Sequence, residues 1–253
     1  MTSGNRIARV AGWAALLVGF CIPLRLSGNP PGDSGAAVRV PSDVAWTRDT
    51  IKLASSGDPF RGMLLARRCE HCHGAEGFSA EAFVPNLAGI DRLSIWKQLQ
   101  DFRSGKRISA VMQPITTPLS AQDFADVSAY FSMLPTFADP QDNRSFPQAA
   151  PDPSKLRVAQ KLISFGDGQR GIPPCQACHG PVGYVKGAPA LTTQNARYLL
   201  TQLQRFTDGT RTNDINVAMR TIARQLTAEE QGALAEYYGA GRAQNPPRST
   251  PGP

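Results

Sequence analysis

Histidine is scarce in this chain of 253 residues, and a continuous apolar segment long enough to cross a membrane is absent. The three histidines, His71, His73 and His179, each lie within two residues of a cysteine. None is left over to act as a catalytic base or as an extra metal ligand elsewhere. A membrane-spanning helix needs about 20 apolar residues, whereas the apolar run 10–24 is shorter and is interrupted by Pro23. These absences disfavour a histidine-based enzyme and a membrane-embedded protein.

The composition is that of an ordinary globular protein, with 41% hydrophobic and 19% charged residues. Nothing in it indicates wholesale disorder, and the length suits one large or two modest domains. Four of the five cysteines fall in two short motifs, and the fifth, Cys21, lies in the amino-terminal apolar run.

The amino terminus has the layout of a secretory signal. Arg6 and Arg9 precede the apolar run, and a loose stretch rich in Gly, Pro and Ser follows over residues 29–37. We interpret residues 1–28 as a signal peptide or an uncleaved amino-terminal anchor. The rest of the chain is then expected in the periplasm, either soluble or attached to the outer face of the inner membrane.

The pentapeptide Cys-x-x-Cys-His occurs twice, at residues 69–73 and 175–179. This spacing is typical of c-type haem attachment. The cysteines form thioether links to the porphyrin, and the adjoining histidine is the proximal iron ligand. The motifs therefore predict two covalently bound haem c groups, held by Cys69, Cys72, Cys175 and Cys178, with His73 and His179 as iron ligands.

Zinc and a redox disulfide are the competing interpretations of these cysteines. Two Cys-x-x-Cys pairs supply the four thiolates of a structural zinc site, but zinc does not explain why a histidine follows each pair. A thioredoxin-like pair calls for a βαβ context, and no strand-rich segment flanks either motif. His71 is interpreted as a variable position that faces away from the haem.

An internal repeat surrounds the two motifs. Asp58-Pro59 predicts the start of a helix that reaches Cys69. In the second copy a helix is predicted from Pro153 to about Phe165, followed by a Gly/Pro loop over residues 166–174. Each motif is then followed by a Pro-x-Leu triplet, which begins at Pro85 and at Pro189.

Two further helices follow each triplet. Ser94 and Asn195 are predicted to cap the middle helices, which carry matching apolar stripes and end at glycine. Capping boxes, Ser120 to Asp123 and Thr227 to Glu230, predict the final helices. The two copies share every element, since Phe102 and Phe206 are 104 residues apart and Cys69 and Cys175 are 106 apart.

The predicted fold is mainly α, with one helical unit repeated in tandem as two domains, each wrapped around one covalently attached haem. The domains are predicted at residues 51–136 and 153–242. A Pro/Gly-rich linker at 29–50, a second linker at 137–152 and a flexible tail at 243–253 complete the organisation. Each domain is small enough that a covalent haem is expected to stabilise its core.

Methionine is the natural sixth ligand, because no histidine is spare. Met63 lies on the helix ahead of Cys69, and Met133 is expected in the core at the end of a helix. Met112 and Met219 lie at equivalent positions, predicted to be loop, each seven residues before the leucine that precedes the final capping box. We therefore predict Met112 and Met219 as iron ligands.

Two further pairs of residues repeat near the predicted haems. The carbonyls of Pro85 and Pro189 can accept a hydrogen bond from the proximal histidine, although loop geometry alone also explains these prolines. Arg107 and Arg211 follow the glycines that end the middle helices and are candidates for contact with haem propionates.

Over residues 57–241 the sequence resembles the dihaem cytochrome c4 family, and this resemblance implies that the two domains are class I cytochrome c domains in tandem. The resemblance rests on Gly57-Asp58 with Arg61-Gly62, on Gly171-Ile172-Pro173 with Cys175 to Pro181, and on Gln98-Leu99, Phe102 and Gly105, repeated as Gln202-Leu203, Phe206 and Gly209. It implies a periplasmic or membrane-associated electron carrier, with His73 and His179 opposite Met112 and Met219.

The predicted function is single-electron transport in a respiratory chain, from a quinol- or substrate-oxidising complex to a terminal oxidase or reductase. One alternative is the cytochrome c subunit of a membrane-bound or flavin-dependent dehydrogenase. Another is a dihaem redox enzyme, which is disfavoured because no catalytic base or spare histidine is present. We therefore interpret the chain as an electron-transfer protein and not an enzyme.

The formal net charge is +7, and most of the excess lies in the second copy. Such a basic face is expected to steer docking to acidic redox proteins, such as a terminal oxidase or dehydrogenase. No nucleic-acid partner is predicted, and membrane association would occur through the amino terminus. The arginines concerned are Arg197, Arg205, Arg211, Arg220 and Arg224.

Overall fold

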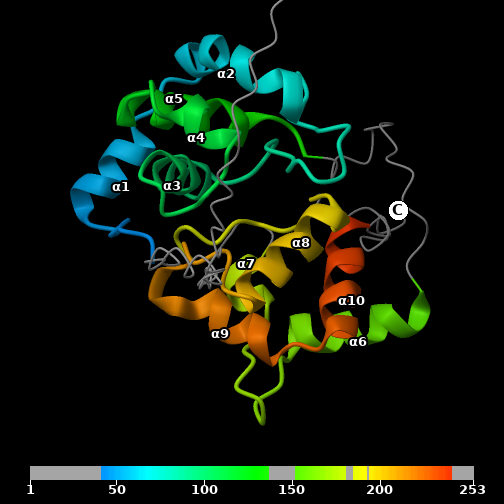
Figure 1. The fold of residues 1–253 in the computed structure, drawn as a ribbon. Coiled ribbons are helices and arrows are strands. Elements are labelled where there is room, and N and C mark those ends of the chain that lie inside the picture. Colours follow the sequence, from blue (N-terminus) through cyan, green and yellow to red (C-terminus); the bar gives the residue numbers. More distant parts are fainter. Residues whose placement is uncertain (1–40, 137–151, 181–184, 193, 241–253) are drawn as a thin grey trace, which may run out of the picture. The chain divides into compact units, whose positions relative to one another are not determined.

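The computed structural model describes residues 41–136, 152–180, 185–192 and 194–240, and within these ranges the ordered elements are helices (Figure 1). The only β pairing among these residues is an isolated antiparallel bridge between Asp167 and Ile172. All of them belong to one compact unit that begins at Val38. The predicted mainly α fold is confirmed.

We divide the described residues into a first half, residues 41–136, and a second half, residues 152–240. The first half contains α1 (Arg48–Ser55), α2 (Pro59–His73), α3 (Arg92–Arg103), α4 (Met112–Thr116) and α5 (Ala121–Met133). The second half contains α6 (Pro153–Ser164), α7 (Gln176–His179), α8 (Ala196–Thr207), the 3-10 turn η1 (Ile215–Val217), α9 (Ala218–Gln225) and α10 (Ala228–Gly239).

Each half packs around its last helix. In the first half α2 and α3 lie against α5, and in the second half α6 and α8 lie against α10 (Figure 1). A Cβ atom on Gly62 would lie 2.0 Å from the backbone oxygen of Asp126, so only glycine allows α2 to approach α5 this closely. Apolar side chains from these helices fill each core, among them Phe124 and Phe131 in the first half and Leu162 and Leu234 in the second.

The predicted starts of α2 and α6 are confirmed. The side chain of Asp58 accepts a hydrogen bond from the backbone N–H of Phe60, and that of Asp152 accepts one from Ser154. A proline follows each aspartate, where its fixed φ suits the first helical turn and its missing N–H costs no hydrogen bond.

The predicted caps of α3 and α8 need correction. Asp91 caps α3 by accepting a hydrogen bond from the backbone N–H of Ser94, so Ser94 is the third residue of the helix and not its cap. Asn195 does occupy the cap position of α8, but its side chain makes no capping bond. Its amide instead donates to the carbonyls of Glu81 and Val84 in the first half.

The ends of these middle helices and the starts of the final helices were predicted correctly. Gly105 and Gly209 follow the helix ends with φ of +74° and +75°, a left-handed conformation that glycine adopts without strain. Ser120 and Thr227 form complete capping boxes with Asp123 and Glu230, respectively.

Helix α1 is not predicted by the sequence patterns. This helix begins at Arg48, so the boundary drawn between residues 50 and 51 falls inside it. Trp46 and Ala54 join the core beside Trp96, and Ser42 donates a hydrogen bond to Asp101 on α3. The segment before residue 51 is therefore packed against the first half and is not a linker over its whole length. The remaining domain limits stay predictions.

Several predicted segments lie outside the described residues. They are the signal or anchor at 1–28, most of the linker at 137–152 and the tail at 243–253. Among the helices that the structure does describe, none has the length and apolar character needed to cross a membrane.

Candidate haem sites

The first Cys-x-x-Cys-His motif forms the carboxyl end of α2. Cys69 is half-buried, Cys72 is exposed, and His73 is buried as the last residue of the helix. Gly74 follows with φ of +79°, and it turns the chain away from the helix axis while its N–H bonds to the carbonyl of Glu70. The two thiols and the imidazole therefore come from one helical turn.

The loop after α2 fixes the orientation of His73. The Nδ1 atom of His73 lies 2.8 Å from the carbonyl oxygen of Pro85. A carbonyl can only accept, so Nδ1 carries the proton and the neutral ring keeps Nε2 as a free electron-pair donor. Burial lowers the pKa of His73, although its bond to Pro85 opposes this, and a lowered pKa favours the neutral form that binds iron.

Ser79 and Asn86, which belong to neither haem motif, hold the loop in place. Ser79 donates to the carbonyl of Cys72 at 2.7 Å, and the side chain of Asn86 accepts from the backbone N–H of Ser79 at 2.9 Å. Asn86 is the middle residue of the first Pro-x-Leu triplet. Its place next to a proline is the only sequence feature that could have indicated its role in holding the loop. These bonds bring Pro85 back to the end of α2.

The second motif lies on the short helix α7. The backbone N–H of Cys175 donates to the carbonyl of Leu162 at 3.3 Å, which holds the motif against α6. Nδ1 of His179 lies 2.7 Å from the carbonyl oxygen of Pro189, so this imidazole has the same tautomer as His73. The suggested hydrogen-bonding role of the two prolines is confirmed. Burial is the main cause that lowers the pKa of His179, and the positive charge of Arg211 lowers it further.

The four motif cysteines form no disulfide in the structure, and they do not form a common metal site. In the part of the chain that the structure describes, no three His, Cys, Asp or Glu side chains gather as metal ligands. The four thiols are therefore not collected as the zinc interpretation requires.

Met112 and Met219 lie on short helices rather than in the predicted loops. Met112 is the first residue of α4 and Met219 is the second residue of α9, and both are half-buried. Asn216 and Val217 precede Met219 with φ of 54° and 60°, a left-handed conformation that is unusual for a β-branched valine. Their roles as sixth ligands stay predictions.

The other two methionines of the described residues, Met63 and Met133, are exposed. Met133 was expected in the core, but its side chain is 66% exposed at the end of α5. Met63 is 45% exposed on α2. Met133 lies on the surface because α5 buries Phe131 in the core and leaves position 133 on its outer face.

The predicted basic face is smaller than its five arginines indicate. Arg211 is bound within a network of side chains at the contact between the halves, and Arg220 donates to Asp214 at 2.7 Å. Arg197, Arg205 and Arg224 are exposed. These three are therefore the arginines of the set that remain available for a partner.

The residues of each motif fit a covalently attached haem. Each motif places two free thiols three residues apart and next to a neutral imidazole, whose Nδ1 is engaged and whose Nε2 can bind iron. An outer carbonyl that fixes the tautomer and the ring orientation is what a metal-ligating histidine requires.

No protein-family model matches the chain, but individual relatives match most of it. It is 41% identical to the thiosulfate dehydrogenase electron acceptor of Stutzerimonas stutzeri, over 81% of this chain and 92% of the relative. It is 34% identical to cytochrome c4 of Pseudomonas aeruginosa, over 72% of this chain and 88% of the relative. The crystal structure of reduced cytochrome c4 from Pseudomonas stutzeri superposes with a TM-score of 0.64 at 33% identity, covering 74% of this chain and all of that chain.

A helical fold that carries two such motifs defines a dihaem c-type cytochrome built from class I units. The two haem c groups are covalently bound, and the molecule is an electron-transfer protein rather than an enzyme. The chain belongs to the cytochrome c4 family, as its identity to cytochrome c4 over more than two thirds of its length shows.

Proposed function

We propose that Cys69 and Cys72 hold one haem, that Cys175 and Cys178 hold the other, and that His73 and His179 are the proximal ligands. Met112 and Met219 are the opposite ligands. The observation that carries this assignment is the pair of bonds from histidine Nδ1 to Pro85 and Pro189, beside free thiols in both halves. Bound haem supplies an iron that gains and loses one electron. Ligation of that iron by the sulfur of a methionine raises its reduction potential.

The protein's own residues orient the ligands and shield them from water. The proline carbonyls keep each imidazole in one tautomer, and His73 is buried at the carboxyl end of α2. The position of Met219 depends on the left-handed residues 216 and 217, which store about 1–3 kcal/mol each. Such local strain is common at functional sites, and it supports a ligand role for Met219.

The electron donor that we propose is a substrate-oxidising dehydrogenase, specifically one that oxidises thiosulfate. The relative with 41% identity is named for accepting electrons from such an enzyme. The acceptor is then a terminal oxidase or reductase, and both partners present acidic surfaces to Arg197, Arg205 and Arg224. The periplasm is the proposed location, since residues 1–28 have the pattern of a secretory signal.

Haem counting tests the residue assignment. We expect the intact mass of the purified protein to exceed that of the mature polypeptide by two haems, and denaturing extraction to release neither. Cys69→Ala with Cys72→Ala should lose one covalent haem, and Cys175→Ala with Cys178→Ala should lose the other. A wild-type mass with one haem or none would contradict the two-site assignment.

A mixing experiment tests the donor. The oxidised protein should be reduced on addition of thiosulfate with a catalytic amount of thiosulfate dehydrogenase, and should stay oxidised when either is omitted. Reduction by a quinol-oxidising complex but not by the dehydrogenase would instead favour the quinol branch. Stable co-purification with a flavin or quinone subunit would favour the dehydrogenase-subunit alternative.

A further inference from the structure

Two residues of the second half, Gln194 and Asn195, hold a loop of the first half in place. We call residues 79–86 the histidine loop, because Pro85 accepts the hydrogen bond from Nδ1 of His73 at 2.8 Å. Gln194 and Asn195 directly precede the first residue of α8, and both are buried. The loop that orients the imidazole of the first half is therefore held from the second half as well as from its own.

The side chain of Gln194 binds both backbone polar groups of Asn86. Its Oε1 accepts from the backbone N–H of Asn86 at 2.7 Å, and its Nε2 donates to the carbonyl of Asn86 at 2.9 Å. Both bonds are buried. Buried backbone groups that lost such a partner would be left without a hydrogen bond, which costs more than the bond itself contributes.

The N–H that Gln194 binds and the carbonyl that His73 binds belong to the same peptide group. The peptide bond between Pro85 and Asn86 joins the carbonyl of one residue to the N–H of the next, and this group is planar. Fixing the direction of the N–H therefore fixes the direction of the carbonyl. The bond that the N–H donates also polarises the group, which makes the carbonyl a stronger acceptor. A continuous chain of hydrogen bonds thus runs from Gln194 through one peptide group to His73.

Asn195 attaches the histidine loop at two further residues. Its Nδ2 donates to the carbonyl of Val84 at 2.7 Å and to that of Glu81 at 3.2 Å. Its backbone N–H donates to Oε1 of Gln194 at 3.2 Å, so the side chain of Gln194 is itself held at the start of α8.

The corresponding residues of the first half have other roles. Ile90 and Asp91 lie 104 positions before Gln194 and Asn195, which is the spacing of the repeat. Ile90 packs in the apolar core, and Asp91 caps α3. Asn195 makes no such capping bond to α8 and binds the histidine loop instead. The two copies therefore use equivalent positions differently.

We propose that Gln194, supported by Asn195, is a positioning residue for His73 and acts across the contact between the halves through the peptide group of Pro85 and Asn86. The inference rests on the proposed function, in which His73 is the proximal iron ligand of the first haem. A hydrogen bond to the outer nitrogen of a ligating imidazole fixes its orientation and raises its basicity. A more basic ligand favours the oxidised iron, so Gln194 lowers the reduction potential of the first haem.

Exchange of the His73 Nδ1 proton with solvent tests the positioning directly. The ring ¹⁵N signals of the reduced holoprotein come from three histidines only. Gln194→Met keeps the size of the side chain and removes both bonds to Asn86, so it should speed the exchange of the His73 proton by roughly tenfold. The His179 proton should exchange at its wild-type rate. An unchanged His73 rate, or an equal acceleration at both histidines, would overturn the inference.

A redox titration that resolves two midpoint potentials gives the second readout. In Gln194→Met one potential should rise, because the imidazole of His73 becomes less basic, and the other should keep its wild-type value. Two unchanged potentials would show that the chain of hydrogen bonds does not reach the iron, and the inference would fail.

Asn195→Asp is a second test variant. The carboxylate keeps the shape of the side chain but cannot donate to Val84 and Glu81. This variant should also speed exchange at His73 and not at His179, and it carries the test if Gln194→Met does not fold. A wild-type rate at His73 in a folded Asn195→Asp protein would contradict the supporting role of Asn195.

Tyr198→Phe is the matched control, because it also removes a hydrogen bond between the halves. Arg107 donates to the Tyr198 hydroxyl at 2.8 Å, and neither residue belongs to the histidine loop. Both histidine protons should therefore exchange at their wild-type rates in this variant. If Tyr198→Phe speeds exchange at His73 as much as Gln194→Met does, general loosening of the contact is the cause and the inference is overturned.

Haem counting separates this inference from the proposed function. The intact mass of the wild type and of each variant is measured before the exchange experiment. A wild-type protein with fewer than two haems contradicts the proposed function itself. If two haems are present and the His73 proton exchanges equally fast in wild type and in Gln194→Met, the positioning role is rejected while the proposed function stands.

Discussion

The first half carries its haem motif at the end of a 15-residue helix, whereas the second half carries it on a helix of four residues. In the second half α6 ends at Ser164, and a loop closed by the bridge between Asp167 and Ile172 leads back to Cys175. Both routes nevertheless place histidine Nδ1 within 2.8 Å of a proline carbonyl. The geometry around the imidazole is therefore retained, although the element that carries it differs.

A second comparison concerns the arginine ahead of each motif. Arg170 binds both oxygens of Glu230 at 2.7 and 2.9 Å, and Glu230 is the third residue of the capped helix α10. In the first half Arg61 approaches Asp123, the corresponding residue of α5, at 3.5 Å, and its side chain is 61% exposed. The same connection between motif and final helix is thus tight in the second half and loose in the first.

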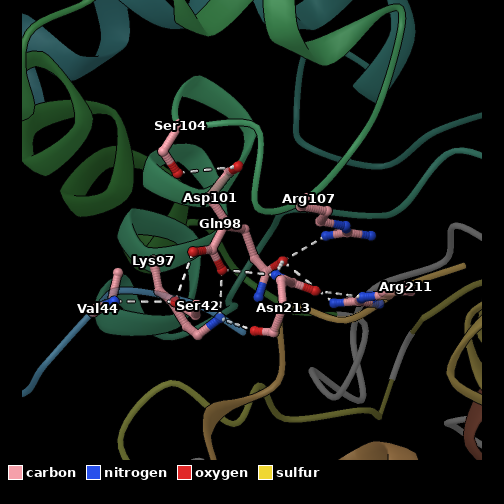
Figure 2. A network of polar contacts seen from close by, with 9 residues as sticks. All are labelled: Ser42, Val44, Lys97, Gln98, Asp101, Ser104, Arg107, Arg211 and Asn213. Carbon is pink, nitrogen blue, oxygen red and sulfur yellow. Dashed lines mark hydrogen bonds and ion pairs between the residues drawn. The ribbon is translucent and has the colours of Figure 1, made fainter. Parts of the chain in front are cut away.

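The halves also differ in buried charge. Lys97 and Asp101 on α3 form an ion pair with exposed fractions of 3% and 1%. The residues 104 positions later are Thr201 and Arg205, which cannot form such a pair. Lys97 also donates to the carbonyl of Asn213 at 2.6 Å, so the first half supplies a buried ion pair to its contact with the second half (Figure 2).

The largest expected effect concerns the sixth ligands, and it tests whether the halves are equivalent. Met112→Ala should abolish the sulfur-to-iron charge-transfer band of the first haem, and Met219→Ala that of the second, so each variant loses about half of the band intensity. The thioether links should remain intact in both. Absorbance of the oxidised protein measures the band, and an unchanged band in either variant would show that its methionine is not a ligand.

The next largest effect concerns the buried ion pair. Lys97→Met should destabilise the protein by about 3–5 kcal/mol, because Asp101 is left buried without its cation. Lys155→Met, which removes an exposed ion pair with Glu236 in the second half, should cost about 1 kcal/mol or less. Denaturant unfolding of the holoprotein measures the free energy of unfolding of both variants. Equal losses of this free energy would contradict the distinction between a buried ion pair in the first half and an exposed one in the second.

Glycine substitutions probe helix packing. Gly62→Ala should cost about 1–3 kcal/mol, since its Cβ would lie 2.0 Å from the backbone oxygen of Asp126 and would force α2 away from α5. Gly232 on α10 has no atom within 4 Å of an added Cβ, so Gly232→Ala should stabilise the second half by about 0.5–1 kcal/mol. Thermal unfolding compares the two variants. A Gly62→Ala variant as stable as the wild type would contradict the close approach of α2 to α5.

A smaller effect is expected for the acidic residues of the two capping boxes and for the dependence of stability on pH. Glu230→Gln should cost about 1 kcal/mol near neutral pH and Asp123→Asn less, since Asp123 lacks a tight arginine partner. Hydrogen bonds from Arg170 lower the pKa of Glu230 below its ordinary value of 4.5, so this stability is present above that pH. It is lost as the pH falls through the lower pKa of the folded protein. Unfolding curves of wild type and Glu230→Gln should therefore converge at low pH, and a constant difference would contradict the linkage.

The smallest effect concerns docking. Arg205→Gln with Arg224→Gln should reduce the ionic-strength dependence of electron transfer to the acceptor, since both side chains are exposed. The Debye length is about 10 Å at 0.1 M salt, so the wild-type rate should fall as salt rises. Stopped-flow kinetics measure the rate, and Lys52→Gln, an exposed basic residue of the first half, is the control. A wild-type rate independent of salt would favour a hydrophobic docking surface.

Much of this protein can be predicted from the sequence because its signals are local. A Cys-x-x-Cys-His motif, an Asp-Pro pair at a helix start and a capping box each involve residues within a few positions, so their chemistry does not depend on distant packing. The repeat then supports each prediction twice. This is why α2, α5, α6 and α10 begin where the sequence predicted.

The tertiary structure decided what depends on residues far apart in the chain. Asp91 rather than Ser94 caps α3, α1 packs beside Trp96, and Met133 lies on the surface, because each outcome depends on which faces meet. The contact of Lys97 with Asn213 joins positions 116 residues apart. No periodicity encodes such a separation, so the bond that joins the buried Lys97–Asp101 ion pair to the second half emerges only when the two halves are packed together.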